Sequence, residues 1–213
     1  MRTELADQLP DRSARKRAAV QAAATALFLR QGYPGTTMDQ VAAQAGVSKP
    51  TVYRFYADKE QLLTAIVLGT LDQAGGPFRR QLAALAQTSQ LEADLLVVAR
   101  RYLATVLQPA VLQLRRLVIG AAHQLPGLAR AYYDRAPEQT MQALADSFGQ
   151  LRDRGLLRPC DPAMAASHFA LLVLGHALDR SMFCGDAEFS AAEQDARARA
   201  GTAAFLAAYG AGG

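Results

Sequence analysis

The chain has 213 residues, a formal net charge of +4 at pH 7, two cysteines, and 51% hydrophobic against 20% charged residues. This length allows one good core or two modest ones, so we expect one or two domains. Two cysteines without a partner pattern exclude a disulfide scaffold and favour the cytoplasm. No membrane span is expected, because the most apolar run, residues 163–178, is shorter than the ~20 residues that a bilayer requires.

Positive charge is concentrated near the N-terminus. Residues 12–59 carry 8 basic and 2 acidic side chains, whereas residues 61–213 carry 14 basic and 13 acidic ones. This distribution favours a polyanionic partner, such as nucleic acid or a membrane surface. Arginine abundance alone proves little, because 20 Arg, 3 Lys and no Asn indicate biased codon usage.

Apolar residues recur at three- and four-residue spacing, and no useful stretch alternates with a period of two, so the sequence predicts an all-α fold. A first helix is expected over residues 12–31, with Gly32 as its stop. A second helix begins after Thr37, because Thr37 and Gln40 match a capping box. Gly46 ends this second helix after two turns.

A third short helix is expected over residues 49–56, with Ser48 as its cap and Pro50 in its first turn. Asp58 then opens a longer fourth helix. The second and third helices are joined by a tight turn whose Gly46 can adopt positive φ, which predicts a helix-turn-helix.

The outward side of the third helix carries polar side chains that can contact phosphates and bases. On a helical wheel Val52 marks the buried side, whereas Arg54 points the opposite way. Arg54 is expected to read a guanine, while Tyr53, Lys49 and Lys59 are expected to position phosphates. The full set of expected DNA contacts is Thr37, Ser48, Lys49, Pro50, Thr51, Tyr53, Arg54 and Lys59.

These residues carry a resemblance to a known family. The matching segments resemble the DNA-binding domain of TetR-family bacterial transcriptional regulators: Thr36 to Ala42, Gly46 to Tyr53, Phe55-Tyr56 and Asp58 to Glu60. Specific similarity covers about residues 12–70, and the remainder resembles the general ligand-binding and dimerisation domain, with an AefR-like type as one option. Phe55 stands where His or Tyr is common, so no phosphate contact is expected from it.

The resemblance implies a homodimer that binds a palindromic DNA operator and responds to a small molecule. It implies a helix-turn-helix domain over residues 1–60 and a ligand-binding and dimerisation domain over 61–213, linked by a helix that starts near residue 58. A repressor released by an inducer is the expected function. The alternative is an architectural protein whose basic N-terminal part binds phosphates without sequence preference.

Four basic residues at the start of the first helix allow two interpretations. Arg12, Arg15, Lys16 and Arg17 resemble the N-terminal extension that some family members lay along the DNA backbone. They also fit a solvated helix start, and the sequence favours neither.

Beyond residue 75 the pattern predicts longer helices, at about 78–87, 91–107, 110–124, 126–135, 138–154, 162–183 and 190–209. The helix over 162–183 is apolar on nearly every side, and the last helix is rich in alanine. We expect these last two helices to form the dimer interface. Alternatively, the alanines are merely helix formers.

Five side chains on or near apolar faces are candidates to line a ligand cavity: Tyr102, His123, Phe148, Phe169 and His176. Plain core packing is the alternative for the aromatic residues among them. No pair of histidines has the i, i+4 spacing of a helical metal site, and catalytic motifs are absent. We therefore expect no metal, no cofactor and no enzymatic activity.

Overall fold

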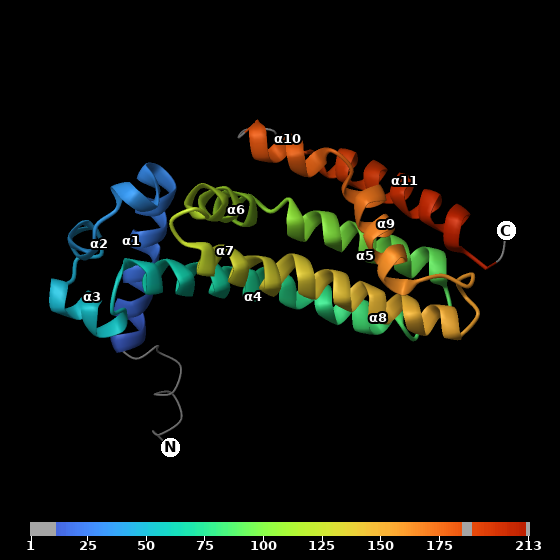
Figure 1. Ribbon diagram of the computed structural model, residues 1–213, viewed down its shortest axis with the longest axis horizontal. Coiled ribbons are helices and arrows are strands. Elements are labelled where there is room, and N and C mark those ends of the chain that lie inside the picture. The colour runs from blue at the N-terminus through green and yellow to red at the C-terminus, as the bar shows by residue number, and fades with distance from the viewer. Residues whose placement is uncertain (1–11, 185–188, 212–213) are drawn as a thin grey trace, which may run out of the picture. The chain divides into compact units, whose positions relative to one another are not determined.

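The computed structural model describes residues 12–184 and 189–211, which form helices joined by turns (Figure 1). In chain order the elements are α1 (Arg12–Gly35), α2 (Met38–Gln44), α3 (Lys49–Phe55), α4 (Lys59–Leu85), α5 (Leu91–Val106), α6 (Pro109–Ala121), α7 (Pro126–Tyr133), η1 (Asp134–Glu138), α8 (Gln139–Asp153), α9 (Pro162–Leu174), α10 (Ala177–Phe183) and α11 (Ala191–Tyr209). These ranges contain no strand, apart from an isolated bridge between Leu157 and Gly210. The all-α prediction is confirmed.

The chain separates into two compact units. The first contains residues up to Gly69 together with Leu117–Ala129, and the second contains Thr70–Arg116 and Arg130–Gly213. The division expected between residues 60 and 61 falls in the first turn of α4, whereas the first unit continues to Gly69. Because α4 and α6 each cross such a division, each contributes residues to both units.

The N-terminal helix follows the sequence pattern. Its buried residues share one side of the helix through their three- and four-residue spacing: Val20, Ala23, Ala24, Leu27 and Phe28. The backbone leaves helical geometry at Gly32, with φ 72° and ψ 175°, so the expected stop is confirmed and one further turn follows to Gly35.

α4 differs from the prediction, because it runs unbroken through residues 75–77, whereas a separate helix was expected to begin near residue 78. Leu71, Phe78, Leu82 and Leu85 are all buried, and their spacing places them along one side of a continuous helix. Burial of this apolar stripe outweighs the local cost of proline, since tertiary packing supplies most helical stability.

Two other boundaries also differ. Pro137 does not interrupt the helical path, because α7 passes into α8 through the π turn η1, a wider coil that tolerates the disturbed hydrogen bonding. The single helix predicted over residues 162–183 is divided into α9 and α10. Gly175 ends α9 with φ 51°, a conformation that takes the chain out of the helix.

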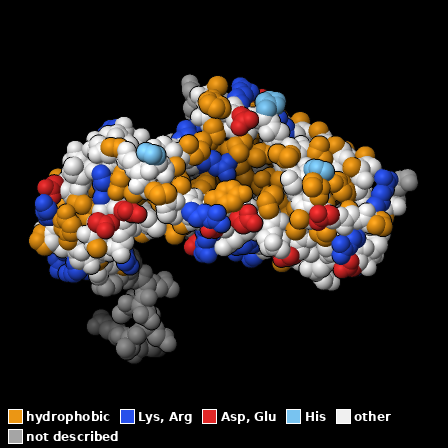
Figure 2. All heavy atoms as spheres, viewed as in Figure 1, with side chains coloured by type: hydrophobic (Ala, Val, Ile, Leu, Met, Phe, Trp, Pro, Cys, Tyr) orange, Lys and Arg blue, Asp and Glu red, His pale blue; other side chains and the backbone are white. Residues whose placement is uncertain are grey.

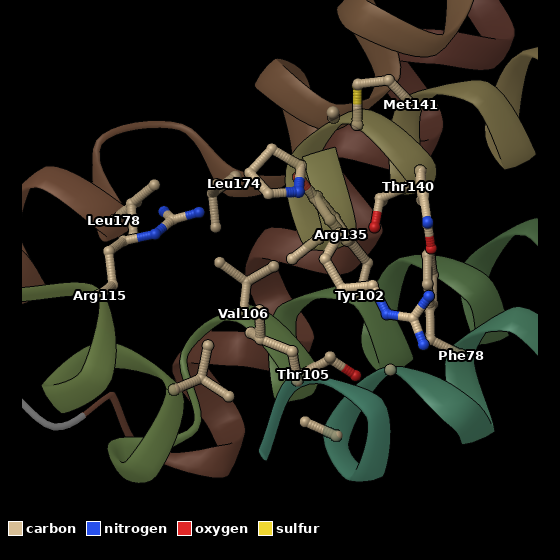
Figure 3. Close-up of a pocket in the computed structure, with 18 of the residues that line it drawn as sticks. Phe78, Tyr102, Thr105, Val106, Arg115, Arg135, Thr140, Met141, Leu174 and Leu178 are labelled. Carbon is tan, nitrogen blue, oxygen red and sulfur yellow. The ribbon is translucent and has the colours of Figure 1, made fainter. Parts of the chain in front are cut away.

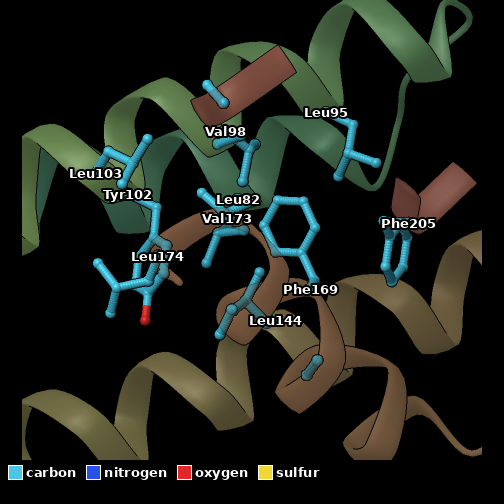
Figure 4. Close-up of a cluster of buried hydrophobic side chains, with 14 of the residues drawn as sticks. Leu82, Leu95, Val98, Tyr102, Leu103, Leu144, Phe169, Val173, Leu174 and Phe205 are labelled. Atoms are coloured by element: carbon cyan, nitrogen blue, oxygen red, sulfur yellow. The ribbon is translucent and has the colours of Figure 1, made fainter. Parts of the chain in front are cut away.

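The core of the second unit forms where α4, α5, α8, α9 and α11 converge (Figure 4). Phe148, Phe169 and Phe205 are fully buried, and their ring centroids lie 5.0 to 5.5 Å apart. Tyr209 stacks on Phe205 with centroids 4.9 Å apart. Such offset and edge-to-face pairs add stability beyond their buried area.

α9 and α11 approach each other closely at Gly201. A Cβ atom at this position would lie 2.7 Å from the Cα atom of Val173 and 2.9 Å from the carbonyl oxygen of Leu172. Only glycine fits without movement of the α9 backbone.

Several large hydrophobic side chains of the second unit remain exposed. Figure 2 shows hydrophobic side chains gathered on one face of this unit, beside α9 and α10. Leu171 is 65% exposed on α9, where Met164 and Leu172 are also exposed, and Phe183 is 88% exposed at the end of α10. In the described part of the chain no single helix has the length and hydropathy to cross a bilayer, although α5 and α6 meet that test as a pair bent by 55°.

Candidate nucleic-acid interface and internal cavity

The first unit contains the predicted helix-turn-helix, formed by α2 and α3 (Figure 1). The capping box opens α2 as expected: the backbone N–H of Gln40 donates to the Thr37 hydroxyl at 3.2 Å, and the Thr37 N–H donates to Gln40 Oε1 at 2.9 Å. Gly46 has φ 64° in the turn. Ser48 occupies the cap position of α3, but its hydroxyl shares a 2.8 Å hydrogen bond with that of Thr51 and caps no backbone group.

α3 buries one side and exposes the other. Val52 is fully buried, whereas Lys49, Pro50, Tyr53 and Arg54 are exposed. The guanidinium of Arg54 lies 5.1 Å from the centre of the Phe55 ring and forms no ion pair within the described residues. This side therefore presents a cation, a phenol and an ammonium group to solvent, a set that suits phosphates and base edges.

The two lysines expected at phosphates occupy different surroundings. Lys49 is exposed and pairs with Asp39 at 2.7 Å, and this hydrogen bond raises the pKa of the lysine. Lys59 Nζ instead donates to the carbonyl oxygen of Tyr33 at 2.7 Å and lies 4.2 Å from the Tyr33 ring centre. Partial burial lowers the Lys59 pKa. Lys59 thus connects the end of α1 to the start of α4, while Lys49 faces solvent.

The four basic residues at the start of α1 lie within the helix itself. Arg12 and Arg15 are exposed, and Lys16 is half-buried. The Arg17 guanidinium lies 5.9 Å from the Phe55 ring centre and 5.6 Å from that of Tyr56, so it packs on aromatic side chains at the end of α3. Arg17 therefore has a contact inside the unit, and the other three keep the two interpretations that the sequence left open.

The second unit contains a partly open cavity of about 280 Å³ (Figure 3). Its apolar wall includes Phe78 on α4, Val106 on α5, Met141 on α8 and Leu174 on α9. Its polar and charged lining residues are Arg79, Tyr102, Thr105, Arg115, Tyr132, Arg135, Gln139, Thr140 and Ser167. A mainly apolar space with a few polar groups is typical of a small-molecule site.

Comparisons with known proteins agree with both the helix-turn-helix of the first unit and the second unit that contains the cavity. The model of the tetR family of bacterial regulatory proteins matches residues 21–66, and that of the AefR-like transcriptional repressor C-terminal domain matches residues 93–211. The second match alone covers more than half of the chain. The chain belongs to the TetR family of transcriptional regulators.

Solved structures of TetR-family proteins extend the likeness over nearly the whole chain. A transcriptional regulator from Mesorhizobium loti MAFF303099 is 39% identical, with a TM-score of 0.85, over 94% of this chain and 100% of that one. The flavonoid-responsive regulator FrrA is 30% identical, with a TM-score of 0.76, over 93% of this chain and 99% of that one.

Among curated TetR-family relatives the likeness is confined to a short segment. The HTH-type transcriptional regulator HbdR of Aromatoleum sp. (strain CIB) is 36% identical over 70 residues, which are 33% of this chain and 31% of that protein. The chain thus matches about a third of the length of this relative.

Of the five residues expected in the cavity of this TetR-family protein, Tyr102 lines it. Phe148 and Phe169 are fully buried in the aromatic core, because their sides of α8 and α9 face α11. His123 is exposed in the first unit. His176 is also exposed, since α9 ends at Gly175 and the histidine lies in the turn that follows.

The arginines of the cavity were not predicted from the sequence. Arg115 lies on α6, where the residues three and four positions away on either side are all apolar, and a charged residue on such a face was a usable signal. Arg135 lies in the π turn beside Pro137, and π turns are frequent at functional sites. Within the described ranges no three His, Cys, Asp or Glu side chains gather to hold a metal ion.

The Tyr56 hydroxyl provides a stability prediction. It is buried and has no hydrogen-bond partner in the described structure. We expect Tyr56→Phe to raise the free energy of unfolding by about 1 kcal/mol, because an unpaired buried hydroxyl is costly. Urea denaturation at fixed protein concentration measures the change. Tyr53→Phe is the matched control, since the exposed Tyr53 should give no change, and an equal effect of both substitutions would contradict the prediction.

Proposed function

We propose that this protein is a homodimeric transcriptional repressor, which leaves its DNA operator when a small molecule occupies the cavity of the second unit. The single observation that carries the proposal is the solvent-facing side of α3. Val52 anchors the helix in the unit while Tyr53 and Arg54 are exposed, as a helix must be to enter a major groove.

The cavity supports the small-molecule part of the proposal. It lies within the second unit, which the AefR-like repressor model covers for most of its length. FrrA, which is similar to this chain over nearly its full length, is described as flavonoid-responsive. A cavity with a mainly apolar wall suits an organic molecule of modest size.

The exposed apolar side chains of α9 support the dimer. Met164, Leu171 and Leu172 face solvent, and along α11 the exposed positions include Ala200, Ala203, Ala204 and Ala207. A second copy would bury this surface, and small residues on α11 allow close helix approach. The mass of the 22.8 kDa chain in sedimentation equilibrium checks the dimer, and a monomer at micromolar concentration would contradict it.

The mechanism is thermodynamic linkage. An effector that binds more tightly to the conformation with wrongly spaced DNA-binding units weakens operator affinity. By linkage, the operator weakens effector binding by the same factor. Two units reading successive major grooves on one face of DNA need a separation near ~34–36 Å or a multiple of it. α4 and α6 contribute residues to both units, so each helix offers a continuous covalent route for the change.

The test is fluorescence anisotropy with the promoter next to the gene, compared with a scrambled duplex at several salt concentrations. We expect the promoter to bind at least ~1,000-fold more tightly than the scrambled duplex, as specific regulators do. Equal affinity for both, with a steep salt dependence, would instead support the architectural alternative.

A further inference from the structure

We infer that the effector of this protein is an organic anion, with an apolar body in the cavity and a carboxylate or similar acidic group held by Arg115 and Tyr102. The inference rests on the proposed role of the cavity as the effector site. It specifies the chemical class of the ligand, which neither the fold nor the family determines.

The charge of the cavity is one-sided. Arg79, Arg115 and Arg135 line it, and among the residues that the structure describes no aspartate or glutamate does. Arg135 is already neutralised, because its guanidinium pairs with Asp72 at 2.7 Å. A cationic ligand would meet the guanidinium groups of Arg79 and Arg115 here, whereas an anion would be attracted.

Arg115 is the guanidinium best placed to hold the charge. It is half-buried, its Nε donates to the Tyr132 hydroxyl at 3.1 Å, and no carboxylate in the described residues pairs with it. Figure 3 shows its side chain extending from α6 toward Leu174 and the centre of the cavity. The terminal nitrogens therefore keep donors free for a bidentate contact, which a planar carboxylate matches.

Tyr102 supplies the second polar contact. Its side chain lines the cavity with 7% of its surface exposed, and its hydroxyl makes no hydrogen bond within the described structure. Burial raises the phenol pKa, and the nearby Arg115 lowers it by less, so the group stays neutral at pH 7. A neutral phenol donates to an anion, and this contact would give the Tyr102 hydroxyl a partner, which it lacks in the described structure.

The remaining wall selects an apolar body. Phe78, Val106, Leu174 and Leu178 contribute apolar surface to the wall. In Figure 3 the first three lie around Tyr102, and Leu178 lies beside Arg115. Together the wall and the two polar groups describe an amphiphile with one acidic end.

The test is isothermal titration calorimetry on the full chain with two probe series of constant shape. One series is octanoate, octanamide and octylammonium; the other is 2-naphthoate, 2-naphthamide and 2-naphthylmethylammonium. We expect the better-fitting acid to bind ~10- to 100-fold more tightly than its amide, as charge-assisted hydrogen bonds allow, and the ammonium compounds to bind most weakly.

Variants test which residues cause the preference for the acid over the amide. Arg115→Gln should reduce the affinity of the acid to that of the amide and leave the amide unchanged, whereas Arg115→Lys should keep part of the preference. Tyr102→Phe should weaken acid binding by about 10-fold. Arg101→Gln, an exposed position on α5 outside the cavity lining, is the control and should behave like the wild type.

Equal affinity of acid and amide, an acid preference that survives Arg115→Gln, or no binding by either acid would overturn the inference. Anisotropy with labelled promoter DNA separates this inference from the proposed function. An acid that binds through Arg115 without releasing DNA contradicts induction and supports the anion site. Release of DNA by the amides and not by the acids supports induction and contradicts the anion site.

Discussion

Replacement of Phe205 with alanine is expected to lower the free energy of unfolding by about 3–5 kcal/mol, the usual cost of deleting a fully buried aromatic ring. Phe205 lies at the centre of the aromatic cluster: its ring centroid is 5.0 Å from that of Phe148, 5.2 Å from that of Phe169 and 4.9 Å from that of Tyr209. Urea denaturation followed by circular dichroism measures the loss. A loss of this size is a large part of the stability of an ordinary domain.

The control for this experiment is Tyr133→Ala, which removes a ring that is 52% exposed in the same unit and outside the cavity lining. We expect this control to change the free energy of unfolding by less than about 1 kcal/mol. Similar losses in both variants would show that the cluster around Phe205 does not hold the second unit together. Both measurements need one fixed protein concentration, because association contributes to apparent stability.

Arg54→Ala is expected to weaken operator binding by about 5- to 150-fold, which corresponds to the ~1–3 kcal/mol of a bidentate base contact. Affinity for scrambled DNA should fall much less, and preference should relax at one base position. Anisotropy with operators substituted one base pair at a time measures both effects. The physical reason is that Arg54 is exposed on the solvent side of α3 with no carboxylate partner in the described residues.

Arg54→Lys separates base reading from simple charge. Lysine keeps the positive charge but loses the planar fork, so we expect it to bind scrambled DNA like the wild type while still losing the base preference. Full operator affinity in the lysine variant would indicate that Arg54 contacts only phosphate.

The first unit could be predicted well because its signals are local. The pairing of Thr37 with Gln40, the positive φ of Gly46 and the buried side of Val52 are set by residues within a few positions of one another. The roles of individual side chains were harder to predict. The ammonium of Lys59 finds the carbonyl of Tyr33, a residue 26 positions earlier, and no local pattern indicates that contact.

The second unit was predicted less well because long-range packing decides its boundaries. Proline and glycine at residues 75–77 and at Pro137 indicate breaks, yet buried stripes and a π turn carry the helices through them. Gly175 was the opposite case, a real break inside an apolar run. Whether Tyr102 or Phe169 faces the cavity depends on which helices lie opposite, and periodicity does not contain that information.

The contact at Gly201 also limits how the second unit can move. The backbones of α9 and α11 approach too closely there for a Cβ atom to fit, and close-packed interiors transmit displacement instead of absorbing it. Ala170, Leu171 and Leu174 of α9 line the cavity. A cavity occupant that presses on α9 would therefore displace α9 and α11 together, and α11 would carry this displacement to the surface.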